Sequence, residues 1–282
     1  MRLARHAALL ILAAASAFSQ ARKTVFMVTD AEGVAGICRQ DQTDPKDPEL
    51  RQLLTGEINA AVEGFLAGGA DEVIVWDGHD GSQTLSTTTI HPRAKLIIGS
   101  LGASMTFERG YAALAFVGQH SMAGVRGGIM AHSFSSLGTQ TLLLNGKPAG
   151  EIAVVSAVAG QFGIPVIFLS GDQAAANEAK ALLPGVEVAA VKEGLARYTC
   201  VSLSATAARD LIREGARRSM AKIGAIQPYR IAGPVTIQVE HTTRNSLPID
   251  AGKASGTELV DDRTIRYHGK DMLEAWMRYL GR

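Results

Sequence analysis

Cysteine is scarce in this 282-residue chain, which contains Cys38 and Cys200 and no other. Two cysteines so far apart in sequence imply no disulfide framework, although an exported protein could pair them. Each could instead be a buried free thiol. Cys38 lies six residues after Glu32, so it is also a remote candidate for a metal ligand.

The chain also lacks an excess of charge and any repetitive organisation. Its formal net charge is +1 and no dense run of lysine and arginine occurs, which argues against a nucleic-acid-binding surface. Neither an internal repeat nor a low-complexity linker is present. With 46% hydrophobic residues, a chain of this length can bury a substantial core, as one large domain or two smaller ones.

The first residues have the pattern of a targeting segment. Arg2 and Arg5 give a positive start, an apolar run over Ala7–Phe18 follows, and small residues lead out of it near Ser19. The run is short for a membrane span. No cysteine stands at its exit, so a lipid anchor is not indicated. An uncleaved anchor is the alternative. We therefore expect residues 1–19 to be a signal peptide of an exported protein, periplasmic or secreted and free of the membrane after cleavage.

Strand-like and helix-like runs alternate beyond residue 20, which predicts an α/β fold. The predicted helices are 48–68, 149–162, 172–183, 204–223 and 271–280. The predicted strands are 24–28, 72–76, 95–98, 113–117, 140–144, 165–169, 186–191, 235–240 and 264–268. Asn145-Gly146 between apolar residues is a hairpin signal, so the sheet should be mixed. We expect a three-layer α/β/α fold with a largely parallel mixed sheet. Residues 20–190 would form a metal-binding catalytic portion, and residues 191–282 a smaller C-terminal α/β portion packed on it.

Two carboxylates stand close together after the first predicted strand. Asp30 and Glu32 are two residues apart, and the alternation of an extended chain would send both to the same side. Two adjacent anions are unfavourable unless a cation lies between them. The pair therefore points to a metal ion. A capped turn around Gly33 is the simpler alternative for Asp30.

Three further candidate ligands occupy similar places, where a strand or turn gives way to a loop or helix. They are His79, His120 and Glu151. In open α/β sheets ligands collect beyond the carboxyl ends of the strands, which makes the shared placement meaningful. Each residue also has a structural explanation: a hydrogen-bonded histidine, or a glutamate at the positive end of a helix. No metal-spacing motif such as HExxH is present.

The charges of these five residues suggest two metal ions. Two zinc ions bring four positive charges against three carboxylates, and the surplus favours a bridging hydroxide, the nucleophile of a two-metal hydrolase. Asp30, short and close to its strand, is the expected bridging ligand. His132 would lie beside the metals and polarise a substrate carbonyl or move a proton to the leaving amine. Arg126, in the glycine-rich loop 124–128, is a weak candidate for holding a substrate carboxylate.

The motifs around these residues resemble those of the zinc-dependent D-aminopeptidases of the dipeptide-transport type. The matching segments, in family order, are 30–36, 77–80, 91–94, 118–120, 132–133, 145–151, 170–172, 191–194 and 270–275. The resemblance implies a dinuclear zinc centre on Asp30, Glu32, His79, His120 and Glu151, and a catalytic role for His132. It also implies a homo-oligomer, a decamer of stacked pentamers that encloses the active sites. The signal-like segment and the glycine-rich loop before His132 depart from the family pattern and bear on the substrate.

Together these observations predict a metal-dependent aminopeptidase for short peptides, with preference for N-terminal D-amino acids. Two alternatives remain open at this point. One is a dinuclear metal hydrolase of another amide or of a phosphoester. The other is an exported peptide-binding protein without turnover, which would leave the paired carboxylates unexplained.

Overall fold

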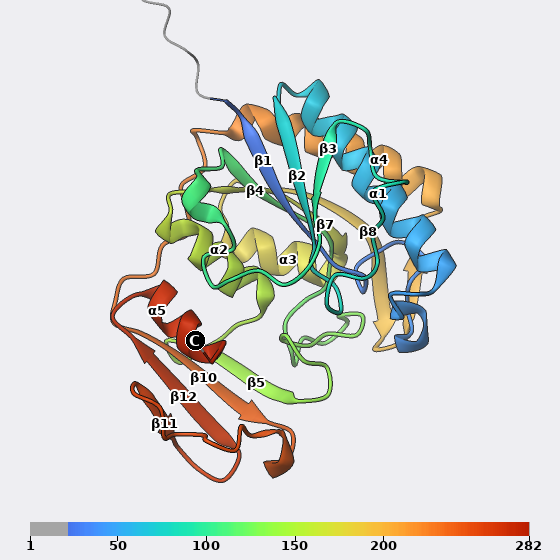
Figure 1. Cartoon of the computed structure of the whole chain (residues 1–282). Helices are drawn as coiled ribbons and strands as arrows, with labels where there is room; N and C mark the ends of the chain where they lie inside the picture. The colour runs from blue at the N-terminus through green and yellow to red at the C-terminus, as the bar shows by residue number, and fades with distance from the viewer. Residues whose placement is uncertain (1–21, 282) are drawn as a thin grey trace, which may run out of the picture.

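A seven-stranded sheet lies at the centre of the computed structural model, which describes residues 22–281 (Figure 1). The strands are β1 Thr24–Thr29, β2 Glu72–Asp77, β3 Ala94–Ile97, β4 Ala113–Gln119, β7 Val166–Asp172, β8 Glu187–Ala196 and β9 Thr199–Ser202. Their order is β3-β2-β1-β4-β7-β8-β9. All neighbouring pairs are parallel except β8 with β9, so the sheet is largely parallel and mixed, as predicted. The predicted signal peptide, residues 1–19, lies outside the described residues.

Helices cover both faces of this sheet and make the three predicted layers (Figure 1). α1 (Pro48–Ala67) and α4 (Ala205–Ser219) pack together on one face, and α2 (Glu151–Gln161) and α3 (Gln173–Leu182) lie on the other. Alternation along β1 supplies both interfaces: Val25 and Met27 join the core under α1, whereas Phe26 and Val28 join the core under α2. A strand that is buried on both faces reads as a continuous apolar run, which is how β1 appears in the sequence.

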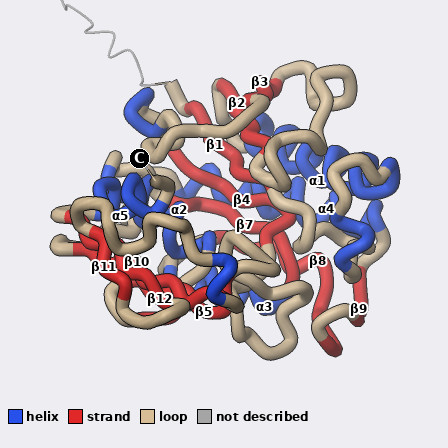
Figure 2. The backbone as a smooth tube through the Cα atoms, turned by 60° about the horizontal axis from the view of Figure 1, so that its bottom comes forward, coloured by secondary structure: helices blue, strands red, loops and turns tan. Residues whose placement is uncertain are grey.

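A second, antiparallel sheet lies to one side, next to α2 (Figure 2). Its strands, in the order β11-β12-β10-β5-β6, are β5 Thr139–Leu144, β6 Lys147–Pro148, β10 Val235–His241, β11 Thr257–Leu259 and β12 Thr264–Gly269. α5 (Met272–Tyr279) packs between this sheet and α2. The hairpin predicted at Asn145-Gly146 is present, and both residues have positive φ (49° and 77°), as a type I′ turn requires. It joins β5 to β6 in the smaller sheet.

The two sheets do not follow the expected division at residue 190. That position lies inside β8, and both α4 and β9 belong to the larger layer although they follow it. The smaller sheet takes β5 and β6 from before the boundary. The chain leaves the larger sheet after β4 and returns at β7. Sequence periodicity indicates the type of an element but not the sheet that it joins, so the membership of the two sheets could not be predicted from it.

Cys38 and Cys200 form a disulfide with their Cα atoms 6.2 Å apart. The bond joins the loop after β1 to β9. It decides between the paired and free thiols that the sequence left open, and it removes Cys38 from the candidate metal ligands. Among residues 22–281, no helix has the length and apolar character needed to cross a membrane.

Candidate metal centre

The site lies where the order of the strands in the sheet reverses. From β1 the chain proceeds to β2 and β3 on one side, and β4 then begins the other side next to β1. Such a reversal is where α/β sheets bind ligands, beyond the carboxyl ends of the strands. Asp30 follows β1, His79 follows β2 and His120 follows β4, while Glu151 is the first residue of α2. The predicted ligands therefore meet at one edge of the sheet.

Two glycines allow the loop after β1 to lie on the end of β4. The Gly33 amide donates to the Gly118 carbonyl at 2.7 Å. A Cβ atom at Gly33 would lie 2.2 Å from the Gln119 carbonyl oxygen, and one at Gly118 would lie 2.1 Å from the Asp30 carbonyl oxygen. Gly118 also has φ +76°, a conformation that side chains disfavour. Without this close approach, Asp30 and His120 could not share one site.

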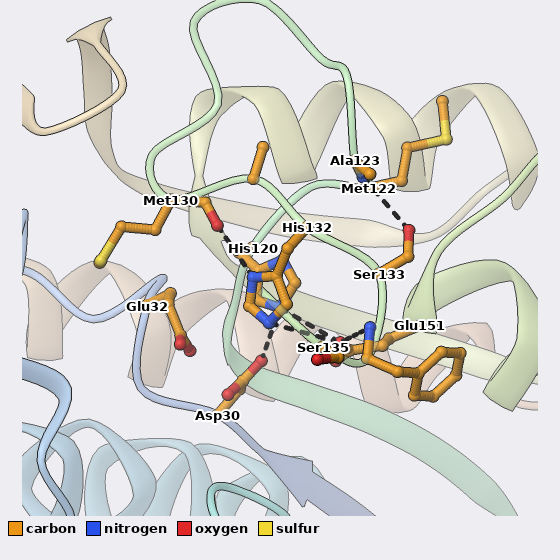
Figure 3. A network of polar contacts seen from close by, with 12 residues as sticks. Asp30, Glu32, His120, Met122, Ala123, Met130, His132, Ser133, Ser135 and Glu151 are labelled. Carbon is orange, nitrogen blue, oxygen red and sulfur yellow. Dashed lines mark hydrogen bonds and ion pairs between the residues drawn. The ribbon is translucent and has the colours of Figure 1, made fainter. Parts of the chain in front are cut away.

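The five predicted ligands come together around Asp30, as Figure 3 shows for four of them. One carboxylate oxygen of Asp30 (Oδ1) lies 3.1 Å from His79 Nδ1, and the other (Oδ2) lies 3.3 Å from His120 Nε2. Glu32 Oε2 lies 3.6 Å from His79 Nδ1, and Glu151 Oε1 lies 3.4 Å from His120 Nε2. Asp30, Glu32, His79 and His120 are buried, and Glu151 is partly buried.

In the neutral form that binds a metal ion, both predicted ligand histidines turn an unprotonated nitrogen toward the carboxylates. His79 Nε2 donates to the Thr43 carbonyl at 2.7 Å, and His120 Nδ1 donates to the Ser121 carbonyl at 2.9 Å. A carbonyl accepts hydrogen bonds and cannot donate them, so these nitrogens carry the protons of the neutral rings. The other nitrogens present lone pairs to Asp30. Histidines that bind metals are usually fixed in this way, by donation of the other ring N–H to a carbonyl, a carboxylate or water.

Buried polar atoms without partners also fit a cation at this site. Glu32 Oε2 and His120 Nε2 are buried and have no hydrogen-bond partner among the described residues. Burial and the neighbouring Glu32 raise the pKa of Asp30 to about 6. Burial opposes a charge on His79, but Asp30 and Glu32 outweigh it and raise the pKa to about 10. Positive charge between the carboxylates therefore stabilises them, and a divalent cation would supply it.

His132 lies beside this group. Its ring stacks on that of His120, with centroids 3.9 Å apart, and its Nε2 is 3.9 Å from Glu151 Oε1. Its Nδ1 donates to the Met130 carbonyl at 2.9 Å. Burial and the neighbouring His120 lower the pKa of His132. Ligating atoms of His120, His132 and Glu151 lie within 4.8 Å of one another, as do those of Asp30, Glu32 and His120, so proximity alone would also admit His132 as a ligand.

Gln119 and Phe134 are residues of the site that the sequence did not reveal. The Gln119 side-chain amide donates to Asp30 Oδ2 and to Glu151 Oε2, both at 3.2 Å. The Phe134 amide donates to Glu151 Oε1 at 2.9 Å. Strand alternation would turn Gln119 away from His120, but the positive φ of Gly118 and a register irregularity in β4 redirect it. The adjacency of Gln119 to His120 was the available signal.

A cavity of about 640 Å³ opens over the ligands. Its polar side is lined by Asp30, Glu32, His79, Asp80, Gln119, His132 and Glu151. Its other lining residues are largely apolar and aromatic. No lysine or arginine of the described chain lines it, so Arg126 is not placed to hold a substrate carboxylate as considered from the sequence.

Comparison with known proteins agrees with the resemblance seen in the sequence. The D-aminopeptidase family model (peptidase family M55) matches residues 24–280. A D-aminopeptidase of Bacillus subtilis (strain 168) is 29% identical over 267 residues, which cover 91% of this chain and 95% of that protein. A solved structure, the Zn-dependent D-aminopeptidase DppA from Bacillus subtilis, described as a self-compartmentalizing protease, is similar with a TM-score of 0.83 at 28% identity. That similarity covers 92% of this chain and 96% of the other.

Proposed function

This chain belongs to the D-aminopeptidase family of metallopeptidases, and from that premise we propose that it removes N-terminal D-residues from short peptides by means of two bound zinc ions. The ligands in this proposal are Asp30, Glu32, His79, His120 and Glu151. His132 is the proposed catalytic residue outside the ligand set.

The observation that carries the two-ion proposal is the position of Asp30. Its two carboxylate oxygens point in different directions, one toward His79 at 3.1 Å and the other toward His120 at 3.3 Å. A carboxylate in this position can bridge two ions, with a histidine available on each side. Gln119 donates to Asp30 and to Glu151, which holds both carboxylates in place. With two divalent ions bound, the three carboxylates would leave the site with a small net positive charge.

When bound, the zinc ions supply Lewis acidity, which makes water a nucleophile at neutral pH and polarises the scissile carbonyl. The chain's own contribution to proton transfer is His132. Its Nδ1–H is held by a backbone carbonyl, so Nε2 is the nitrogen that exchanges protons with a molecule in the cavity. We assign to Nε2 the uptake of the proton that the attacking water loses and its delivery to the leaving amine.

The charge of the cavity supports an amino-terminal substrate. Asp30, Glu32 and Glu151 would be neutralised by the proposed zinc ions, so Asp80 is the free carboxylate of its lining, and no lysine or arginine of residues 22–281 lines it. Carboxylates stabilise a free ammonium group and repel a free carboxylate. A peptide would therefore enter with its amino terminus toward the ligands.

Export and assembly belong to the same proposal. The signal-like segment at residues 1–19 and the Cys38–Cys200 disulfide both suit an oxidising, non-cytoplasmic compartment. The solved relative is described as self-compartmentalizing. We propose that this chain also forms a closed homo-oligomer, with a decamer as the expected size. Light scattering coupled to size-exclusion chromatography of the mature protein would measure the size, and a monomer would contradict this part.

The test of the function is the metal content of the purified protein together with hydrolysis of D-Ala and L-Ala dipeptides before and after chelation. We expect about two zinc ions per chain and chelator-sensitive cleavage of the D-peptide. Asp30→Asn should lose most metal and turnover, and His132→Ala should lose turnover while keeping most metal. His268→Ala, an exposed histidine on β12, is the matched control and should change neither. Full turnover in Asp30→Asn, or in protein without metal, would contradict the proposal, and a phosphoester assay in parallel would reveal the other hydrolase chemistry.

A further inference from the structure

One wall of the cavity is built by three aromatic rings in mutual contact. The ring centroids of Phe134 and Trp276 are 5.1 Å apart, and those of Phe134 and Tyr279 are 5.6 Å apart. Trp276 and Tyr279 stack at 4.9 Å with an interplanar angle of 13°. All three residues line the cavity. They come from two distant segments, the loop after His132 and helix α5.

This aromatic wall has a fixed position relative to the ligands. The Phe134 backbone amide donates to the Glu151 carboxylate at 2.9 Å, and His132 stands two residues before it. Phe134 has φ 62°, a left-handed conformation that side chains rarely adopt. Unfavourable backbone conformations persist where the surrounding structure enforces them, and they gather at functional sites. Asp80 and Met105, which line the same cavity, also have positive φ (36° and 50°).

Further apolar residues line the cavity, together with polar ones such as Ser135 and Ser136. The apolar ones include Leu101, Met105, Phe116, Val155 and Leu280. A cavity of about 640 Å³ lies within the range of about 300–1,000 Å³ that holds drug-sized ligands, so it has room beyond two alanine residues. Transfer of an apolar side chain from water to such a surface is favourable, in proportion to the area removed from water.

We propose that the wall formed by Phe134, Trp276 and Tyr279 is a subsite for a bulky apolar side chain of the substrate. The inference rests on the proposed function, and it deepens that function by naming the substrate class as peptides with a large apolar or aromatic residue next to the scissile bond. That residue stands on the amino or on the carboxyl side of the bond. The two positions are separated by the test.

The first part of the test is kinetic. The zinc-loaded full chain is assayed with D-Ala-Gly, D-Phe-Gly and D-Ala-D-Phe. We expect kcat/KM for one of the two phenylalanine peptides to exceed that for D-Ala-Gly by about tenfold or more, and its identity assigns the side of the bond. Tyr279→Ala should abolish the preference, so that kcat/KM for the favoured phenylalanine peptide falls to about the value for D-Ala-Gly with the same variant. Met277→Ala removes an exposed apolar side chain of the same helix that does not line the cavity, and it should preserve the preference.

The second part measures binding without turnover. Trp76 and Trp276 are the two tryptophans of the chain and both line the cavity, so intrinsic fluorescence reports on its occupancy. We expect D-phenylalaninol, which has no peptide bond, to bind about tenfold more tightly than D-alaninol in the wild-type chain. Leu280→Ala, at the end of α5, serves as the second variant should Tyr279→Ala fail to fold. It should reduce this difference by about threefold or more.

The outcomes separate the two proposals. Cleavage of D-Ala-Gly with no preference for either phenylalanine peptide, and equal binding of the two amino alcohols, would overturn the subsite and leave the proposed function intact. No cleavage of any D-peptide by the zinc-loaded chain would overturn the proposed function and the substrate class with it. A preference that survives in both Tyr279→Ala and Leu280→Ala would place the subsite elsewhere.

Discussion

Replacing Lys192 by methionine would test whether Lys192 holds in place the backbone of the loop after β1, which carries the proposed zinc ligands Asp30 and Glu32. Lys192 lies in β8, is 4% exposed, and extends its ammonium group under the loop after β1. There it donates to the carbonyl oxygens of Glu32 at 2.5 Å and Val34 at 2.8 Å, and also to that of Ile37. Burial lowers its pKa to about 8, so the group remains mainly charged at neutral pH. All three of its donor hydrogens serve one loop.

The expected cost follows from these contacts. Methionine keeps most of the apolar stem but leaves the buried carbonyl groups of Glu32 and Ile37 without a donor, and each such group costs about 1–3 kcal/mol. The Val34 carbonyl still accepts from the Ile37 amide at 3.1 Å. Removal of the buried charge returns part of its desolvation penalty. We therefore expect the free energy of unfolding to fall by about 3 kcal/mol. Because Glu32 is a proposed zinc ligand, displacement of its backbone should also weaken zinc binding by about tenfold to a hundredfold. Loss of a contact that orients a metal ligand typically has an effect of this size.

Two measurements check this expectation: urea unfolding of the metal-free chain, and zinc affinity from competition with a chelator. Lys180→Met is the matched control, since Lys180 is exposed at the end of α3, and it should change neither quantity. A loss of stability below about 1 kcal/mol with unchanged zinc affinity in Lys192→Met would refute the reasoning. Lost stability with unchanged zinc affinity would show that the loop is fixed by other contacts.

Three further substitutions test other parts of the structure. Burial raises the pKa of Glu57 from 4.5 to about 7, so its stabilising contribution, complete below about pH 4.5, should be lost as the pH rises to about 7. Glu57→Gln should remove about 3 kcal/mol of that pH dependence in urea unfolding between pH 4 and 8, and an unchanged profile would contradict the assignment. Replacing both Cys38 and Cys200 by alanine removes a cross-link between residues separated by 162 positions and should cost about 2–5 kcal/mol by thermal or urea unfolding, whereas an equally stable variant would mean that the bond does not form. Asp172→Ala removes the N-cap of α3 and an acceptor for the buried Ile129 amide, so it should cost about 2–4 kcal/mol, against about 1 kcal/mol for Asp271→Ala, which removes the α5 cap alone; equal losses would exclude the second role.

The sequence predicted the larger elements well because their signals are local. The helix from Pro48, the strand from Thr24 and the Asp172 N-cap all appear where apolar spacing and capping chemistry placed them. β6, β9 and β11, of two to four residues each, were not predicted, since such short runs carry little periodicity, although the four-residue β3 was found. Their formation depends on neighbouring strands that lie far away in the sequence.

The site divides in the same way. Asp30, Glu32, His79 and His120 were found because each follows a strand, and a sheet places the ends of parallel strands together. Gln119 was missed because its direction depends on the unusual backbone of Gly118. The aromatic wall could not have been predicted, since Phe134 and Trp276 are 142 positions apart and meet through the packing of α5 against α2.

At the proposed zinc site, the contacts that hold the loop after β1 are distinct from the side chain that is proposed to bind the metal. The loop backbone is fixed by Lys192, by Glu57, which accepts from the Ala35 amide at 2.8 Å, and by the disulfide at Cys38. The side chain of Glu32 takes no part in this and keeps a buried carboxylate oxygen without a partner. Such an oxygen destabilises the metal-free chain and is satisfied when a cation binds. A ligand that binds the folded chain alone stabilises it by RT ln(1 + [L]/Kd). A flexible loop would relieve the cost of the unpaired oxygen by moving Glu32 into water. Because the backbone is fixed, that cost is relieved only by the bound cation, so we expect the fixed loop to raise the affinity for the proposed zinc.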